Sequence, residues 1–240
     1  SSKILNSVVS INKDQDYLIK NIKKKYNFEY IENNIFKKIA NENILVFGES
    51  IIDNYIFSKY LGVSGKDQIQ TFEKINEKNY AGGALATANN ISSFSSNIKL
   101  VTIFGDNTSQ LNFCKKKLNK NIKLKYFVRK DSPTITKTKI LDVDENEKVL
   151  GLYKFNDKEM SSVEYKKVYS LFKQNIQKAD IVIITDYGHY LIDDHIAKKI
   201  SDIKKKLIVN TQINAANFGF HGISKYKGCE CAVINELELR

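Results

Sequence analysis

The chain has 240 residues, of which 42% are hydrophobic and 27% are charged, a composition typical of a globular protein with a substantial core. No apolar run is long enough to span a bilayer and no signal-peptide pattern opens the sequence, so we expect no membrane role. The net charge of +11 would suit nucleic acid, a membrane surface or a phosphorylated small molecule. Because the lysines are scattered in short runs without a basic recognition helix, we interpret them as a solvated surface, with nucleic-acid binding as the weaker alternative.

The first 40 residues are rich in lysine and contain neither glycine nor proline, which predicts a helical connector. A buried strand is predicted in the segment NILVFGESIID, residues 43–53. Similar apolar runs, each ending in polar or glycine residues, follow at 98–106, 180–188, 206–212 and 231–236. Amphipathic helices are predicted at 161–177 and 193–204. This alternation predicts an α/β fold with a largely parallel sheet, in which ligands bind at the carboxyl ends of the strands.

Two segments, 54–81 and 133–156, alternate polar and apolar residues and break this pattern. They predict a small antiparallel sheet attached to the main domain, either a lid or a dimerisation surface. The sole proline, Pro133, begins the second segment, where its missing N–H does least harm.

The three cysteines, Cys114, Cys229 and Cys231, form no CxxC pair and no disulfide framework. This usage is typical of a reducing compartment, and we expect a cytoplasmic protein. Cys229 and Cys231 would share one face of a strand, but no third ligand accompanies them. We therefore predict structural thiols rather than a metal site.

The segment GGALATANN places the Gly82–Gly83 pair directly before a predicted helix. A helix N-terminus presents unpaired N–H groups, and glycine allows close approach of a polar ligand such as a sugar or a phosphate. The alternative is a plain tight turn, which the dipeptide alone favours. Asp53, at the end of the first strand, carries a carboxylate suited to accept two sugar hydroxyls.

The stretches GESIID, GG, PTITKTK, ITDYG and NELE occur in an order that resembles the ribokinase-like (PfkB-type) carbohydrate kinases. Over residues 43–240 the chain looks most like the kinase half of bifunctional heptose-7-phosphate kinase/heptose-1-phosphate adenylyltransferases. The resemblance implies a three-layer α/β sandwich with a mostly parallel central sheet and a small antiparallel β lid. It also implies transfer of phosphate from ATP, with Mg²⁺, to a sugar or sugar phosphate, and homodimerisation through the lid.

The resemblance assigns roles to two groups of residues. Asp53 and the Gly82–Gly83 pair would bind the sugar, and Lys137 would neutralise a phosphate on the substrate. An exposed strand lysine is the alternative for Lys137. Asn235 and Glu238 match an N-x-x-E motif associated with Mg²⁺ and phosphate, and helix-cap chemistry is the alternative for this pair.

Departures from the family pattern make heptose phosphate a poor candidate, so we expect a different sugar or sugar phosphate. The family usually has asparagine at the position of Ala86, and a lysine after D-Y-G at the position of His189. It has a D-P-K turn at the position of residues 210–212. We interpret His189 as a loop histidine. The family's catalytic aspartate, in a G-A-G-D motif, would lie beyond Arg240, so we expect a C-terminally truncated domain that is inactive by itself. If it is active, Asp186 is the first candidate base.

Residues 1–5, SSKIL, resemble the stretch that closes nucleotidyltransferase domains. We therefore interpret residues 1–40 as a helical connector with such a remnant, and 41–240 as an incomplete ribokinase-like kinase domain of a bifunctional sugar-activating protein. The alternative function is a non-catalytic module, derived from a kinase, that binds a carbohydrate or a sugar phosphate.

Overall fold

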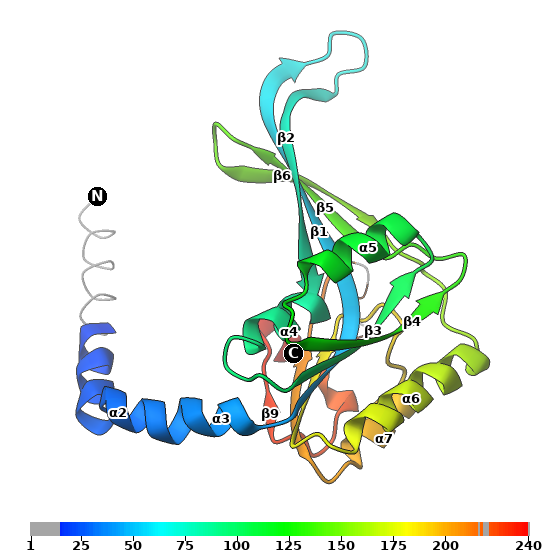
Figure 1. Cartoon of the computed structure of the whole chain (residues 1–240). Helices are drawn as coiled ribbons and strands as arrows, with labels where there is room; N and C mark the ends of the chain where they lie inside the picture. Colours follow the sequence, from blue (N-terminus) through cyan, green and yellow to red (C-terminus); the bar gives the residue numbers. More distant parts are fainter. Residues whose placement is uncertain (1–14, 216, 218–220, 240) are drawn as a thin grey trace. The chain divides into compact units, whose positions relative to one another are not determined.

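The computed structural model describes residues 15–215, 217 and 221–239, and its contacts divide the chain into two units, Ser1–Asn41 and Glu42–Arg240 (Figure 1). In the first unit, residues 15–25 are helical. The helical segments α2 (Phe28–Ile31), η1 (Glu32–Phe36) and α3 (Lys37–Asn41) follow. Asn27 begins α2 as its N-cap, because its side chain accepts a hydrogen bond from Tyr30 N at 2.7 Å. The segment 1–5, whose resemblance to a nucleotidyltransferase end was noted above, lies outside the described residues.

The second unit is built on a parallel sheet with the strand order β4-β3-β1-β7-β8-β9. Its strands are β1 (Ile44–Val63), β3 (Ile98–Gly105), β4 (Ile122–Arg129), β7 (Ile181–Asp186), β8 (Lys206–Thr211) and β9 (Cys231–Ala232). Every neighbouring pair along this order is parallel, and β1 lies between β3 and β7. The predicted α/β fold with a mostly parallel sheet is therefore confirmed.

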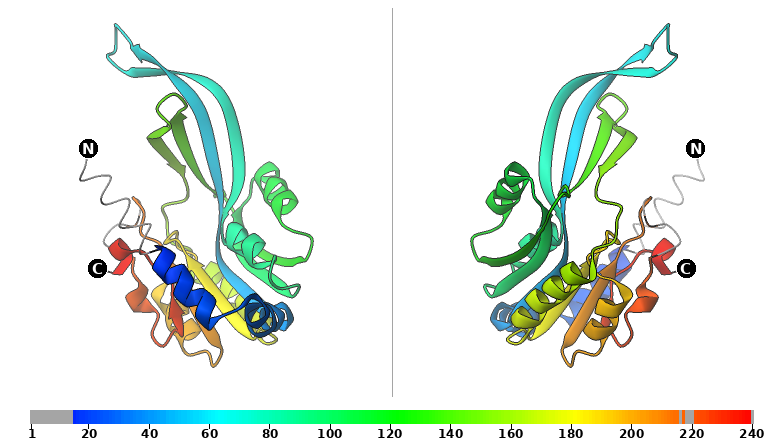
Figure 2. Two further views of the ribbon diagram at one scale, coloured as in Figure 1. Left: turned by 90° about the vertical axis from the view of Figure 1, so that its left-hand side faces the viewer. Right: turned by 90° about the vertical axis from the view of Figure 1, so that its right-hand side faces the viewer.

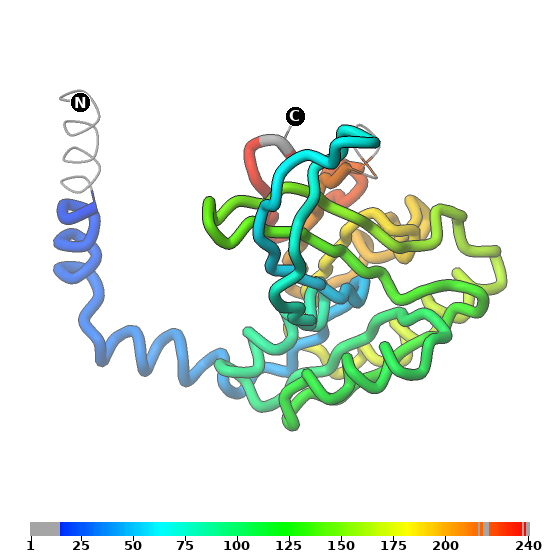
Figure 3. Tube along the Cα trace, turned by 90° about the horizontal axis from the view of Figure 1, so that it is seen from above, coloured from blue at the N-terminus to red at the C-terminus, as the bar shows by residue number. Residues whose placement is uncertain are grey.

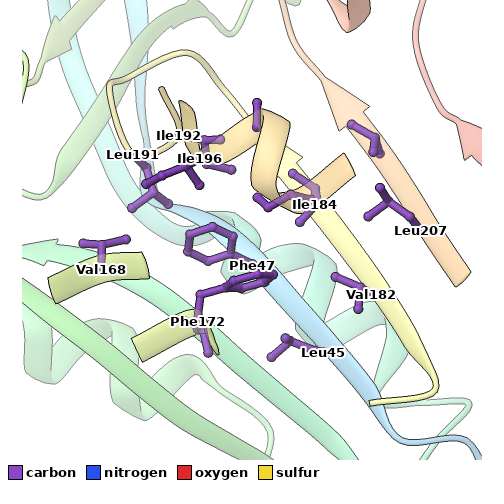
Figure 4. Packing of buried hydrophobic residues seen from close by; sticks show 14 of the residues in the cluster. Leu45, Phe47, Val168, Phe172, Val182, Ile184, Leu191, Ile192, Ile196 and Leu207 are labelled. Atoms are coloured by element: carbon purple, nitrogen blue, oxygen red, sulfur yellow. The ribbon is translucent and has the colours of Figure 1, made fainter. Parts of the chain in front are cut away.

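Alternate residues of the strands face two helical layers, as expected for a sheet buried on both sides. On one face, Phe47 and its neighbours pack against α6 (Ser162–Ile176) and α7 (Asp194–Ser201) (Figure 4). The rings of Phe47 and Phe172 lie 4.7 Å apart between their centroids. On the other side, α4 (Ala84–Ile91) packs on β1 and β3 and buries Ala84, Leu85 and Ala88 completely. Helix α5 (Thr108–Lys117) follows β3.

The lid is made of two hairpins that extend beyond the parallel sheet (Figure 2). The outer half of β1 pairs antiparallel with β2 (Gln70–Gly83), and β5 (Ile135–Asp142) pairs antiparallel with β6 (Glu147–Lys154). Figure 3 shows the hairpins side by side from above. The register of β1 and β2 shifts between Phe57 and Ser58, and again between Tyr60 and Gly62.

The predicted antiparallel β lid attached to the main domain is confirmed, and the structure adds two features. The junction of the hairpins is parallel, because β1 and β5 both run outward from the carboxyl edge of the main sheet. The lid is also continuous with that sheet, since the 20 residues of β1 belong to both. The sequence pattern overestimated β9, which ends at Ala232. It did not identify β4, because Lys123 and Lys125 alternate with apolar residues there and leave no continuous apolar run.

In the part of the chain that the structure describes, no helix is long and apolar enough to cross a membrane.

The Phe47–Phe172 contact gives a test of the core. Replacing Phe172 with alanine removes a ring that is 1% exposed, so we expect a loss of about 3–5 kcal/mol in the free energy of unfolding. Chemical denaturation measures this loss. Val163→Ala, at a position 58% exposed in the same helix, is the matched control and should change stability by less than about 0.5 kcal/mol. Equal losses in the two variants would contradict the packing.

Candidate functional site

Asp53 and Gly82 lie side by side where β1 leaves the parallel sheet. In the pairing of β1 with β2, Gly82 is opposite Ile51, two positions before Asp53. A Cβ atom added to Gly82 would lie 2.1 Å from Asp53 Oδ2, far inside van der Waals contact. The missing side chain of Gly82 therefore makes the space that the carboxylate occupies.

Gly83 serves a different purpose, as the N-cap of α4. Its φ of 59° is in the left-handed region, where glycine is favoured. An added Cβ would lie 2.4 Å from the carbonyl oxygen of Glu49. The tight passage from strand to helix accounts for Gly83 by itself, which is the turn alternative of the sequence analysis.

Two lysines from β5 flank Asp53. Lys139 Nζ donates a hydrogen bond to Asp53 Oδ1 at 3.3 Å and another to the hydroxyl of Tyr55 at 3.2 Å. Lys137 is in register with Asp53 and is only 6% exposed, so it is not an exposed strand lysine. Its Nζ atom lies 5.4 Å from the ring centroid of Tyr153, a cation–π contact. Burial lowers the pKa of Lys137, and the charge of Asp53 opposes this shift.

Sequence reasoning missed Lys139 and Glu49. Lys139 had a visible signal in the sequence, because residues two apart on a strand share a face and Lys137 was already a candidate.

Glu49 had no such signal, since a carboxylate inside an apolar run gives no indication of its partners. It is fully buried and accepts hydrogen bonds from Tyr187 N at 2.9 Å and His189 N at 3.2 Å. Burial, and then the nearby charge of Asp186, raises the pKa of Glu49 to about 7.

Asp186, the candidate base within the chain, is held in a buried network at the end of β7. Its carboxylate lies 2.6 Å from Lys225 Nζ and accepts a hydrogen bond from the hydroxyl of Tyr226. His221 Nε2 lies 3.4 Å from its other oxygen. A carboxylate that is only 1% exposed and bonded in this way is poorly available to take a proton from a substrate.

His189 lies in the loop after β7, as expected, and its side chain is buried there. Its ring packs against Phe155, with 5.0 Å between the ring centroids. Burial, followed by the positive charges of Lys137 and His221, lowers the pKa of His189 to about 4. The imidazole is therefore neutral at physiological pH.

Asn235 and Glu238 form a reciprocal cap on α8 (Glu236–Leu239). Asn235 N donates to Glu238 Oε2 at 2.8 Å, and Glu238 N donates to Asn235 Oδ1 at 3.0 Å. The second oxygen of Glu238 accepts a hydrogen bond from Ile213 N at 3.1 Å. The helix-cap alternative is thus present in the structure. Among the described residues, no group of three or more His, Cys, Asp or Glu side chains is arranged to hold a metal ion.

The structure therefore brings together Asp53, the Gly82–Gly83 pair and Lys137, on the lid strands next to the carboxyl edge of the parallel sheet. Among the bonds of the described residues, none joins Asn235 or Glu238 to this group. The two sets of sequence-predicted residues are consequently separate features, one from the lid strands and one from the segment after β9.

Several known proteins are similar to this chain in sequence or in fold. No protein-family model matches the chain. Among curated proteins, it is 25% identical over 199 residues to the bifunctional protein HldE of Aliarcobacter butzleri, covering 82% of this chain and 40% of that protein. The HldE proteins of Nitratiruptor sp. and Helicobacter pylori are 23% and 26% identical, over 65% and 69% of this chain. The chain spans about a third to two fifths of the length of these relatives.

Solved structures with the same fold are sugar kinases. Ribokinase from Thermotoga maritima has a TM-score of 0.53 at 15% identity, over 82% of this chain and 60% of its own. Phosphofructokinase-2 from Escherichia coli, solved with fructose-6-phosphate, has a TM-score of 0.54 at 12% identity, over 73% and 57% of the two chains. The chain thus has the ribokinase-like fold and is homologous to the HldE bifunctional proteins, as the order of its motifs indicated.

The buried pair Glu49 and His189 predicts opposite effects of pH on stability. The lowered pKa of His189 gives stability that is complete above pH 6.5 and is lost as the pH falls toward 4. The raised pKa of Glu49 gives stability that is complete below pH 4.5 and is lost as the pH rises through about 7. The two contributions largely offset each other in the native protein.

His189→Gln should make the opposing contributions visible, because it removes the one from His189 and leaves the one from Glu49. The difference in unfolding free energy between the native protein and the variant should grow by up to about 3 kcal/mol between pH 4 and pH 6.5. Urea unfolding at several pH values measures it. His195→Gln, at an exposed position, is the control for the substitution itself. A flat difference for His189→Gln would show that its pKa is ordinary.

Proposed function

We propose that residues 42–240 form a ribokinase-type domain that phosphorylates a sugar or sugar phosphate with ATP and Mg²⁺, within a bifunctional sugar-activating protein. The observation that carries the proposal is the contact of the Asp53 carboxylate with Gly82, flanked by Lys137 and Lys139. It lies at the carboxyl edge of a parallel sheet, where α/β proteins bind their ligands.

The chemistry of this group suits a polyhydroxylated, anionic ligand. Asp53 uses one oxygen for Lys139 and keeps lone pairs on both oxygens for hydroxyl donors. The positive charges of Lys137 and Lys139 exceed the single negative charge of Asp53 at this point of the lid. That excess favours a phosphate on the substrate, and we assign Lys137 to it. The sugar is expected to lie between β1 and the passage from Gly82 to Gly83.

The parts that would handle ATP and Mg²⁺ are less complete in the described residues. Magnesium is usually bound through one or two carboxylates together with phosphates and water. Glu238 fits one such position, since each of its oxygens accepts one backbone N–H and retains a lone pair. With Asp186 engaged by Lys225 and Tyr226, we propose that the catalytic base is not among the described residues.

A homodimer through the lid is part of the proposal. The lid strands carry several exposed apolar side chains, an unusual feature for strands that face solvent. They are Tyr60, Leu61, Ile75, Leu150 and Leu152. A second copy of the lid would cover them.

Asp53→Asn tests the sugar site. Because hydrogen bonds to a charged acceptor contribute about 1.5–3 kcal/mol, we expect sugar or sugar-phosphate binding to weaken by roughly 10- to 100-fold. Isothermal titration with a panel of sugars and sugar phosphates measures this. The control is Asp67→Asn, in the exposed turn between β1 and β2, which should bind as the native chain does. Unchanged binding by Asp53→Asn would remove the proposed site.

ATP consumption with the same panel separates the kinase from the non-catalytic alternative. This 240-residue chain is compared with one extended at its C-terminus. Turnover by the extended chain alone supports the kinase and places the base in the extension. Turnover by both contradicts our assignment of the base, while sugar binding without turnover in either favours the binding module.

Gly82→Ala tests the packing of Asp53 in an independent way. The new methyl group would meet Asp53 Oδ2, a side-chain atom that can move, so we expect the carboxylate to shift and sugar binding to fall by at least about 10-fold. Thermal unfolding should be less affected than binding. Gly65→Ala, where an added Cβ meets nothing within 4 Å, is the matched control. Native affinity in Gly82→Ala would mean that the position of the carboxylate does not matter.

A further inference from the structure

A small polar cavity lies beside the proposed sugar site, between the carboxyl ends of β1 and β3 and the loop that leads into β5. Its polar lining residues are Ser50, Arg129, Ser132, Thr134, Asn156 and His189. The wall is fixed by close backbone packing, since a Cβ on Gly105 would lie 2.2 Å from the carbonyl oxygen of Ser132. The cavity volume is about 30 Å³, and about 10–15 Å³ is enough for one water-sized group.

His189 is the unexplained member of this lining. Its side chain is 7% exposed, and neither ring nitrogen has a hydrogen-bond partner among the described residues. A buried polar atom without a partner costs about 1–3 kcal/mol, so such groups in native proteins call for an explanation. His189 is among the residues that line the cavity. Because the torsion that orients the imidazole is soft, the ring can turn to offer a nitrogen to a group bound there.

Three of the other polar residues of the lining already have partners. Ser50 Oγ is hydrogen-bonded to Thr102 Oγ1 at 2.7 Å, and Thr134 Oγ1 accepts from Gly105 N at 3.1 Å. Arg129 donates to the carbonyl oxygens of Lys158 and Glu159 at 2.8 and 2.9 Å.

The charge of Arg129 is also balanced, because its Nε atom lies 3.7 Å from a carboxylate oxygen of Glu164. Among the described lining residues, no cation is therefore left to attract a phosphate. A neutral imidazole has one N–H donor and one acceptor nitrogen, and a hydroxyl group matches either.

We propose that this cavity is a subsite for one hydroxyl group of the sugar, with His189 as its hydrogen-bonding partner and specificity-determining residue. The inference rests on the proposed function and extends it, because it makes the substrate a sugar whose terminal hydroxymethyl group enters the cavity. The rest of the sugar stays at Asp53, and any phosphate stays at the lysines of β5.

The two sites are continuous along the strands. Ser50 and Ile135 line the cavity, and they precede Asp53 and Lys137 by three and two positions on β1 and β5. His189 is also near enough to Lys137 for that charge to affect its pKa. A ligand bound at Asp53 thus has both the cavity and Lys137 within reach.

The three histidines, His189, His195 and His221, allow a direct readout of ring contact by imidazole ¹H–¹⁵N NMR. The probes are sugar pairs that differ by one terminal hydroxyl: D-galactose and D-fucose, D-glucose and D-quinovose, and D-ribose and 5-deoxy-D-ribose. Inorganic phosphate is the anion probe. Backbone amides near Asp53 report binding at the main site, and the exposed His195 is the internal control.

We expect at least one hydroxymethyl sugar to shift the His189 ring signals more than its deoxy partner does. It should also bind about 3- to 10-fold more tightly than that partner. His189→Leu should abolish this preference, and His189→Gln, which keeps a donor and an acceptor, should retain part of it. Unchanged backbone amide spectra away from the cavity would show that both variants remain folded.

Each contrary outcome has a distinct meaning. If amides near Asp53 respond while the His189 ring does not, or responds equally to both members of a pair, the subsite is wrong and the main site stands. If phosphate alone moves the His189 signals, the cavity is an anion site and the inference is overturned. If no probe affects Asp53 or His189, the proposed function and this inference fail together.

Discussion

The structure depends on one strand that belongs to two sheets. The first residues of β1 pair with β3 and β7 in the parallel sheet, and its later residues pair with β2 and β5 in the lid. The change occurs between Glu49 and Ile51, so Asp53, the residue that would hold a sugar, lies just beyond the point where the strand exchanges one set of neighbours for another. Because β2 and β5 pair with β1 on both sides of Asp53, its carboxylate is carried on a paired strand rather than on a loop.

A second constraint is the burial of charge behind this stretch. Glu49 and Asp186 come from adjacent strands and are both almost completely enclosed. Their repulsion is relieved in different ways, since Glu49 accepts two backbone N–H groups and Asp186 is paired with Lys225 and Tyr226. Such networks are costly when one member is missing, and well ordered when all partners are present. The loop after β7 is held against the sheet through these contacts.

The sequence predicted the layers and the group around Asp53, but not the interactions that support it. Apolar runs and helix periodicity are local signals, and they identified most strands and the helices α6 and α7. The contact of Gly82 with Asp53 could be anticipated only from the order of motifs, because it joins residues 29 positions apart in different strands. The apolar run around Glu49 indicates a buried position, but nothing local in the sequence identifies the groups that bind its carboxylate. His189 was expected in a loop, and its burial depends on Phe155, which comes from a segment assigned to the lid.

The register shifts in the β1–β2 hairpin divide the lid into two mechanical parts. Inward of Phe57 the pairing is regular and continues into the parallel sheet, so this portion, with Asp53, moves as one body with the core. Outward of the shifts, the strands are twisted and their ladder is interrupted, which concentrates bending at Ser58 and Gly62. The direction of the hairpin tip is therefore set at these shifts, and the position of the carboxylate is set by the regular pairing before them. One strand thus fixes the shape of the lid and the place of ligand contact at different points along its length.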